Sequence, residues 1–157
     1  MEKKRIRIAI VSVCIIAVLV GLIIFFMPNA STEFSKGDKV VIHIMAPSFE
    51  DMYGYEFRIH YNSEELEYSG ELTSDIDEIY TTFSKPFDGY ELVGATMIGD
   101  VSGVDSSKKT QVCQITFKAL VDCVLTEESI SIDSVGVVSS QLDYDENVTG
   151  WRWSASS

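Results

Sequence analysis

The chain has 157 residues, of which 46% are hydrophobic, and its formal net charge is −12. This length accommodates one ordinary domain with a short additional segment and excludes two full domains. After residue 27 the chain holds 8 basic and 23 acidic residues, a net charge of −15. Such a surface repels phosphate backbones, so we do not expect nucleic acid as a partner.

The N-terminal segment has the composition of a membrane anchor. Residues 1–7 contain four basic side chains, and residues 8–27 are an unbroken run of 20 uncharged, mostly apolar residues. As a helix rising about 1.5 Å per residue, this run spans about 30 Å, the thickness of the bilayer hydrocarbon core. A cleaved signal peptide has a shorter apolar region and small residues at its cleavage site, whereas Pro28 stands at the nearest candidate site. We therefore predict a transmembrane helix over 8–27, with a signal peptide as the alternative.

The basic residues also predict which way this segment is oriented. The positive-inside rule places residues 1–7 in the cytoplasm and the rest of the chain, after the apolar run, outside. We expect a single-pass protein of the cell membrane with its C-terminal domain outside, or a secreted domain if the segment is cleaved. Residues 28–36 are polar and short, and we predict that they link the membrane segment to a domain spanning 37–153.

Short strands with turn signals between them follow one another through this domain. The pattern predicts a helical turn over 73–79 capped by Ser74, a turn at Pro86 and a polar loop over 99–107. Outside the apolar run, no amphipathic helix of ten or more residues is indicated. The predicted fold is therefore an all-β antiparallel sandwich with jelly-roll topology. The predicted strands cover residues 39–45, 53–62, 65–72, 80–83, 90–98, 111–121, 129–133, 135–139 and 148–153.

The strand over 53–62 has the clearest pattern, because apolar and polar residues alternate along it without interruption. Alternation at every second residue is typical of a half-buried strand. It predicts Tyr55, Phe57, Ile59 and Tyr61 facing the core. It predicts that Glu56, Arg58 and His60 face outward.

The strand over 90–98 is apolar on both faces. Leu92 and Ile98 share one face, and Val93, Ala95 and Met97 share the other. A two-layer sandwich covers only one face of each sheet, so such a strand either lies under a loop or offers one side to a partner. We predict that Val93, Ala95 and Met97 form the dry centre of a binding surface.

Several segments, in this order and spacing, resemble the cohesin family. They are residues 37–42 (GDKVVI), 53–62 (YGYEFRIHYN) leading to Leu66-Glu67, 113–119 (CQITFKA) and 129–132 (SISI), and the resemblance covers roughly residues 36–139. Cohesins are jelly-roll modules that hold dockerin domains in cellulosome-type assemblies. The chain has Asn62-Ser63 where family members usually have Asp-Pro.

The resemblance implies a non-enzymatic module that binds a dockerin across one sheet face. Glu56 is similar to an acidic contact residue of the family, and Asp100 and Gly103 resemble an acidic residue and a glycine at the rim of its interface. A dockerin carries its own calcium, so the resemblance implies no cofactor or metal in this chain. The predicted partner-binding residues are Glu56, Arg58, His60, Val93, Ala95, Met97, Asp100 and Gly103.

The sequence also bears on three other kinds of function: an enzyme, a carbohydrate-binding module and a structural surface protein. No nucleophile elbow accompanies His43 or His60, and no paired metal-ligand spacing occurs, so we expect no enzyme. The main alternative is a carbohydrate-binding sandwich module, in which exposed aromatic rings would have to form a row. A structural protein that meets other copies through sheet edges is a third possibility. The aromatic residues in question are Tyr80, Tyr90, Tyr144, Trp151 and Trp153.

Two cysteines lie in the predicted outer domain. Cys113 shares its parity with Ile115 and Phe117, which favours a buried thiol. A disulfide with Cys123 would require the chain between them to fold back, because bridged Cα atoms lie within about 7 Å of each other. Location outside the cell permits this bridge without requiring it.

Overall fold

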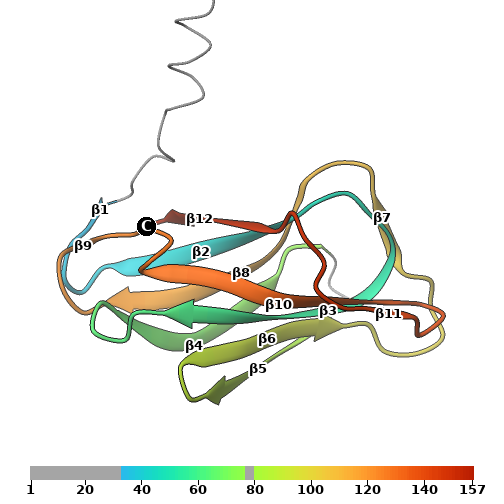
Figure 1. Cartoon of the computed structure of the whole chain (residues 1–157), viewed down its shortest axis with the longest axis horizontal. Coiled ribbons are helices and arrows are strands. Elements are labelled where there is room, and N and C mark those ends of the chain that lie inside the picture. The colour runs from blue at the N-terminus through green and yellow to red at the C-terminus, as the bar shows by residue number, and fades with distance from the viewer. Residues whose placement is uncertain (1–32, 77–79) are drawn as a thin grey trace, which may run out of the picture. The chain divides into compact units, whose positions relative to one another are not determined.

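The computed structural model describes residues 33–76 and 80–157, and every regular element in them is a β-strand (Figure 1). The predicted segments 1–7 and 8–27 lie outside the described residues. Within the described part of the chain, no helix has the length and apolar character needed to cross a membrane. The strands are β1 (Glu33–Phe34), β2 (Lys39–Ala46), β3 (Phe49–Tyr61), β4 (Leu66–Ser74), β5 (Thr81–Phe87), β6 (Tyr90–Thr96), β7 (Val104–Ser106), β8 (Thr110–Ala119), β9 (Cys123–Val124), β10 (Ile130–Ser139), β11 (Tyr144–Asp145) and β12 (Arg152–Ser156).

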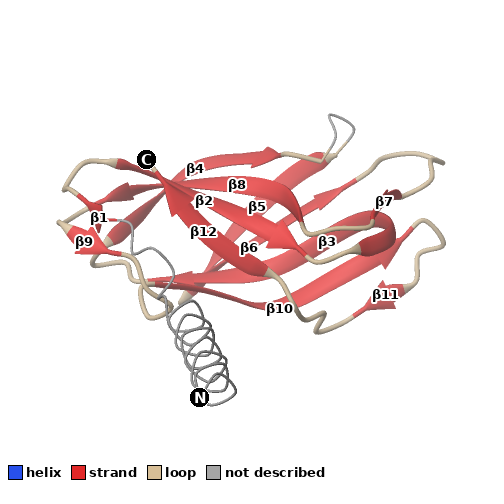
Figure 2. Ribbon diagram, turned by 90° about the horizontal axis from the view of Figure 1, so that it is seen from above, coloured by secondary structure: helices blue, strands red, loops and turns tan. Residues whose placement is uncertain are grey.

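The strands form two main sheets, and all of their pairings are antiparallel. The first, here called the β3 sheet, has the order β11-β10-β3-β6-β5, with β7 paired to β3. The second, here called the β2 sheet, has the order β12-β2-β8-β4. The two sheets are stacked, as Figure 1 and the rotated view in Figure 2 show. The predicted antiparallel sandwich is confirmed.

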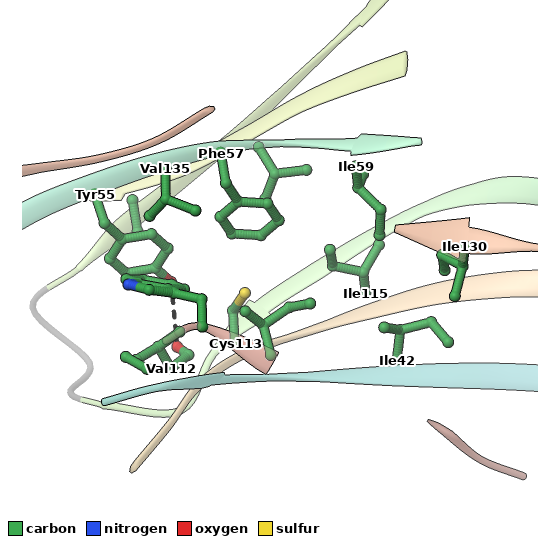
Figure 3. Packing of buried hydrophobic residues seen from close by; sticks show 14 of the residues in the cluster. Ile42, Tyr55, Phe57, Ile59, Val112, Cys113, Ile115, Ile130 and Val135 are labelled. Carbon is green, nitrogen blue, oxygen red and sulfur yellow. Dashed lines mark hydrogen bonds between the residues drawn. The ribbon is translucent and has the colours of Figure 1, made fainter. Parts of the chain in front are cut away.

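The core lies between these sheets because one face of each central strand is apolar. Along β2 the buried residues alternate with partly exposed ones, and the same alternation holds on β3 from Tyr55 to Ile59, whereas β8 is buried over most of its length. Phe57 from the β3 sheet and Ile42 and Ile115 from the β2 sheet are completely buried and point into the space between the two layers (Figure 3). The hydroxyl of Tyr55 donates a hydrogen bond to the carbonyl of Val112 at 3.2 Å, which connects the two layers. Burial raises the pKa of Tyr55 above its ordinary value.

The domain extends beyond the predicted limits at both ends. Phe34 is 3% exposed and pairs with Cys123, so the chain already belongs to the domain within the predicted linker 28–36. At the other end, β12 continues to Ser156. The predicted strands 129–133 and 135–139 are one strand, β10, with a bulge where Ser134 adopts a positive φ of 50°.

Two local predictions in the middle of the chain are wrong. Pro86 lies within β5 and not in a turn, which is possible because β5 is at the edge of its sheet. In the predicted helical turn over 73–79, β4 continues to Ser74 and a bend follows, while residues 77–79 lie outside the described part.

Both cysteines of the domain are free thiols. Cys113 is fully buried, as its parity predicts, and burial raises its pKa to about 12. Cys123 lies on β9, in the small sheet that β9 forms with β1. The structure therefore contains no bridge between these two residues.

Candidate functional site

The outward side of β3 has the residues that alternation predicts. Arg58 is exposed and Glu56 and His60 are partly exposed, while Phe57 and Ile59 between them are buried. The Nε2 atom of His60 lies 3.1 Å from a carboxylate oxygen of Asp133 on β10, and its Nδ1 atom lies 3.1 Å from the carbonyl oxygen of Gly89. These contacts hold the imidazole ring in place on the surface.

The predicted dry centre is wrong, because Val93, Ala95 and Met97 face the core. Their exposed fractions are 1%, 1% and 3%. Residues paired across an antiparallel ladder point to the same side of the sheet, and Val93 pairs with Phe57. The outward residues of β6 are instead Leu92, Gly94 and Thr96, which pair with Arg58, Glu56 and Gly54.

The register of the five strands therefore defines one continuous surface, which we call the outer face. It combines the outward residues of β3 and β6 with those of the flanking strands β5, β10 and β11. Its members are Glu56, Arg58, His60, Phe83, Lys85, Phe87, Tyr90, Leu92, Gly94, Thr96, Asp133, Gly136, Val138 and Tyr144.

A hollow of about 210 Å³ occupies one end of the outer face. Gly94 and Gly136 flank Glu56 on the neighbouring strands, and each glycine is covered by an aromatic ring. A Cβ atom on Gly94 would lie 2.4 Å from Cζ of Phe83, and one on Gly136 would lie 2.2 Å from the hydroxyl of Tyr144. The Tyr144 hydroxyl donates a 2.9 Å hydrogen bond to Glu56, which raises the pKa of Tyr144.

The other end of the outer face carries cations stacked on aromatic rings. The rings of Phe87 and Tyr90 are nearly parallel, at 10°, with their centroids 5.1 Å apart. The Arg58 guanidinium lies 5.0 Å from the centre of the Tyr90 ring, and the Lys85 ammonium lies 5.1 Å from that of Phe87. Such cation–π contacts position positive charge at the surface of an otherwise acidic domain.

The two predicted rim residues lie in the loop between β6 and β7, and not on the strands of the outer face. Asp100 is exposed there. The backbone N–H of Gly103 donates a hydrogen bond to Oδ1 of Asp51 at 2.9 Å. A Cβ atom at Gly103 would lie 2.4 Å from the backbone carbon of Asp51 on β3, so close packing of the β6–β7 loop against this strand explains the glycine.

Phe83, Phe87, Leu92 and Tyr144 are the large apolar or aromatic residues of this surface that the sequence did not assign to the binding site. Phe83, Lys85 and Phe87 alternate along β5, which is a strand signal. The signal was obscured because Pro86 predicts a turn. Tyr144 belongs to a strand of two residues, which is too short for periodicity to detect.

The aromatic row that a sugar-binding surface requires is not formed by the predicted residues. Trp151 and Tyr80 are each 6% exposed and belong to the core. The Trp151 ring lies 5.5 Å from that of Tyr55 and 6.0 Å from that of Phe57. The row that the carbohydrate-binding alternative would require, of these two residues with Tyr90, Tyr144 and Trp153, is therefore not formed.

Comparison with known proteins identifies the family. The sandwich is similar to a cohesin module of a family 33 glycoside hydrolase from Clostridium perfringens ATCC13124 (TM-score 0.57, 13% identity), with 81% of this chain and 93% of that one covered. It is also similar to the type II cohesin A11 from Bacteroides cellulosolvens (TM-score 0.55, 16% identity), with coverages of 75% and 88%. A search of curated proteins finds no match. The sequence model of the cohesin domain matches residues 27–149, most of the chain, and this protein therefore belongs to the cohesin family, whose members are protein-docking modules.

Proposed function

We propose that this protein is a membrane-tethered, extracytoplasmic docking module that binds a dockerin domain through its outer face. Cohesin domains bind dockerin partners, which supports the class of ligand. The apolar run over 8–27 and the basic residues before it support the tether and its orientation. In this proposal the partner supplies its own calcium.

The proposal rests mainly on one observation: the most exposed aromatic residues of the described chain lie together on the outer face. Phe83, Phe87 and Tyr144 are 42%, 43% and 47% exposed, and they are the large aromatic side chains most exposed within residues 33–76 and 80–157. All three belong to the outer face. A partner that covers them removes apolar surface from water, at roughly 25 cal/mol per Å².

The distribution of polar groups is also that of a protein interface. Leu92 is partly buried and lies at the middle of the surface, between Arg58 on β3 and Lys85 on β5. Glu56 and Asp133 add negative charge on neighbouring strands. Protein interfaces typically have a dry centre and a polar rim, with a few residues contributing most of the affinity. Leu92 takes the central position predicted for Val93, Ala95 and Met97.

The test is a pull-down with residues 32–157 as bait and secreted proteins of the same organism as prey, with and without EDTA. We expect an EDTA-sensitive partner that binds the wild type and is lost with Leu92→Asp. Val121→Asp is the matched control, because Val121 is similarly apolar and 43% exposed but lies in the β8–β9 loop. Equal capture by Leu92→Asp and wild type would rule out this surface.

A second candidate is binding of a polysaccharide, which one feature of the hollow favours. Phe83 and Tyr144 lie on either side of Glu56, an arrangement of two rings and a carboxylate that can hold a sugar ring and its hydroxyl groups. Retention of the same fragment on insoluble polysaccharide, lost with Phe83→Ala and insensitive to EDTA, would support this function in place of dockerin binding.

The membrane tether needs a separate experiment. We expect the full chain to remain with the membrane fraction after carbonate extraction, and external protease to degrade the domain in intact cells. A mature protein that begins after residue 27 in the culture medium would show cleavage of the segment and would contradict the tether.

A further inference from the structure

Glu91 has a buried carboxyl group that does not belong to the outer face. It precedes Leu92 on β6, but its side chain points to the opposite side of the sheet, and the residue is 2% exposed. Ser84 lines the same cavity as Glu91 and partly offsets the effect of burial, which raises the pKa of Glu91, and Ser84 Oγ lies 2.9 Å from the hydroxyl of Tyr68. Among the described residues, the ion pairs are Lys39 with Glu71 and His60 with Asp133, so no basic side chain in this part of the chain pairs with Glu91.

This carboxyl group lines an open-sided cavity of about 580 Å³ at one side of the sandwich. The cavity lies between β4, the last strand of the β2 sheet, and β5, the last strand of the β3 sheet. Tyr61 and Tyr68 line the same cavity as Glu91, and the pKa values of both phenol groups are raised, mainly by burial and further by the charge of Glu91. The remaining walls are Ser63, Leu66, Glu67, Ser84, Pro86 and Leu120.

The chemistry of these walls suits an organic cation. A buried carboxylate with no cation beside it is unfavourable, and a guanidinium or ammonium group would restore charge-assisted hydrogen bonds. The faces of phenol rings also attract cations, and Leu66, Pro86 and Leu120 offer apolar contact for an alkyl stem. The acidic domain around the cavity draws positive charge toward it.

The cavity lies between two edge strands, and this position indicates which kind of molecule would supply the cation. An edge strand presents unpaired backbone groups, to which an extended peptide can add as a further strand. Pro86 lacks an N–H group and blunts this capacity on β5, whereas β4 contains no proline. We propose that the cavity binds an arginine or lysine side chain of an extended peptide segment paired with β4, at a site separate from the outer face.

The test uses the full chain in detergent micelles and isothermal titration calorimetry with the peptide acetyl-TVRVT-amide. We expect binding, and at least tenfold weaker binding when citrulline replaces arginine, because citrulline keeps the shape and removes the charge. This comparison needs no variant of the protein. Binding of both peptides with equal affinity, or no binding of the arginine peptide, would overturn the proposal.

Two variants then locate the site. Glu91→Gln should weaken the arginine peptide at least tenfold, while Glu64→Gln, the same change of charge in the nearby β3–β4 turn, should stay within twofold of wild type. A thermal unfolding curve establishes that Glu91→Gln is folded. Wild-type affinity of folded Glu91→Gln would refute the site, and agmatine binding as tightly as the peptide would refute the requirement for a peptide backbone.

Discussion

Alanine substitutions at Gly94 and Gly136 should differ in their effect on stability, although both glycines lie under an aromatic ring of the hollow. A Cβ atom at Gly94 would lie 2.8 Å from the backbone oxygen of Tyr55 as well as 2.4 Å from Phe83. The ring can turn away, but the Tyr55 oxygen belongs to the β3–β6 ladder, so the two strands would have to separate. Overpacking of this kind costs about 1–3 kcal/mol.

For Gly136→Ala, the three nearest atoms all belong to the Tyr144 side chain, which is 47% exposed and can rotate into solvent. Loss of the Tyr144–Glu56 hydrogen bond costs about 0.5–1.5 kcal/mol. Gly136 does not have a positive φ, so alanine can adopt its backbone conformation without strain. The substitution then stabilises the fold by about 0.4–1 kcal/mol, because it lowers the conformational entropy of the unfolded chain. The net effect on the free energy of unfolding should therefore be close to zero.

The measurement is urea unfolding of residues 32–157, followed by the fluorescence of the buried Trp151. Gly94→Ala should lower the free energy of unfolding by at least about 1 kcal/mol more than Gly136→Ala, or roughly 4 °C in melting temperature. If Gly136→Ala proved the more destabilising of the two, the flexible placement of Tyr144 and the rigid placement of the Tyr55 carbonyl would both be wrong.

Two further predictions concern the inward side of β6. Val93→Asp should destabilise the domain by about 3 kcal/mol or more, because it places an unpaired carboxylate in the core; a melting temperature equal to that of wild type would contradict the inward placement. Burial raises the pKa of Glu91 in the folded state. The contribution of this group to the free energy of unfolding is therefore fully present below its pKa in the unfolded chain, about 4.5, and is lost as pH rises through its pKa in the folded protein. Glu91→Gln should therefore match the wild type near pH 4 and become relatively more stable toward neutral pH, and parallel melting temperatures for the two proteins across this range would refute the assignment.

The sequence predicted best those features that depend on local periodicity. On β3, polar and apolar residues alternate, so the inward and outward sets follow from the chain alone, and the structure confirms them. On β6, Leu92 and Val93 are both apolar, and only the pairing of Val93 with Phe57 decides which of them is buried. That pairing joins residues far apart in the sequence, so no single-strand pattern contains it.

Very short elements were missed for a different physical reason. The strands β1, β9 and β11 have two residues each, and a period of two cannot be recognised in two residues. They are held by their partners, as Phe34 is by Cys123 and Tyr144 by Val138. The hollow of the candidate site depends on β11, which is why Tyr144 could not be assigned to it from the sequence.

Glu91 and Leu92 allow the two proposed binding sites to be separated, since they are neighbours on one strand and face opposite sides. Leu92→Asp should abolish capture of the calcium-dependent partner and leave the affinity for acetyl-TVRVT-amide unchanged. Glu91→Gln should weaken binding of acetyl-TVRVT-amide and leave capture of the calcium-dependent partner unchanged. Replacing the carboxyl group by an amide inside the cavity leaves the outer face intact. If one partner bound across both regions, each substitution would weaken both interactions. Such a result would contradict two separate sites and would indicate one continuous interface that reaches around the edge strand β5.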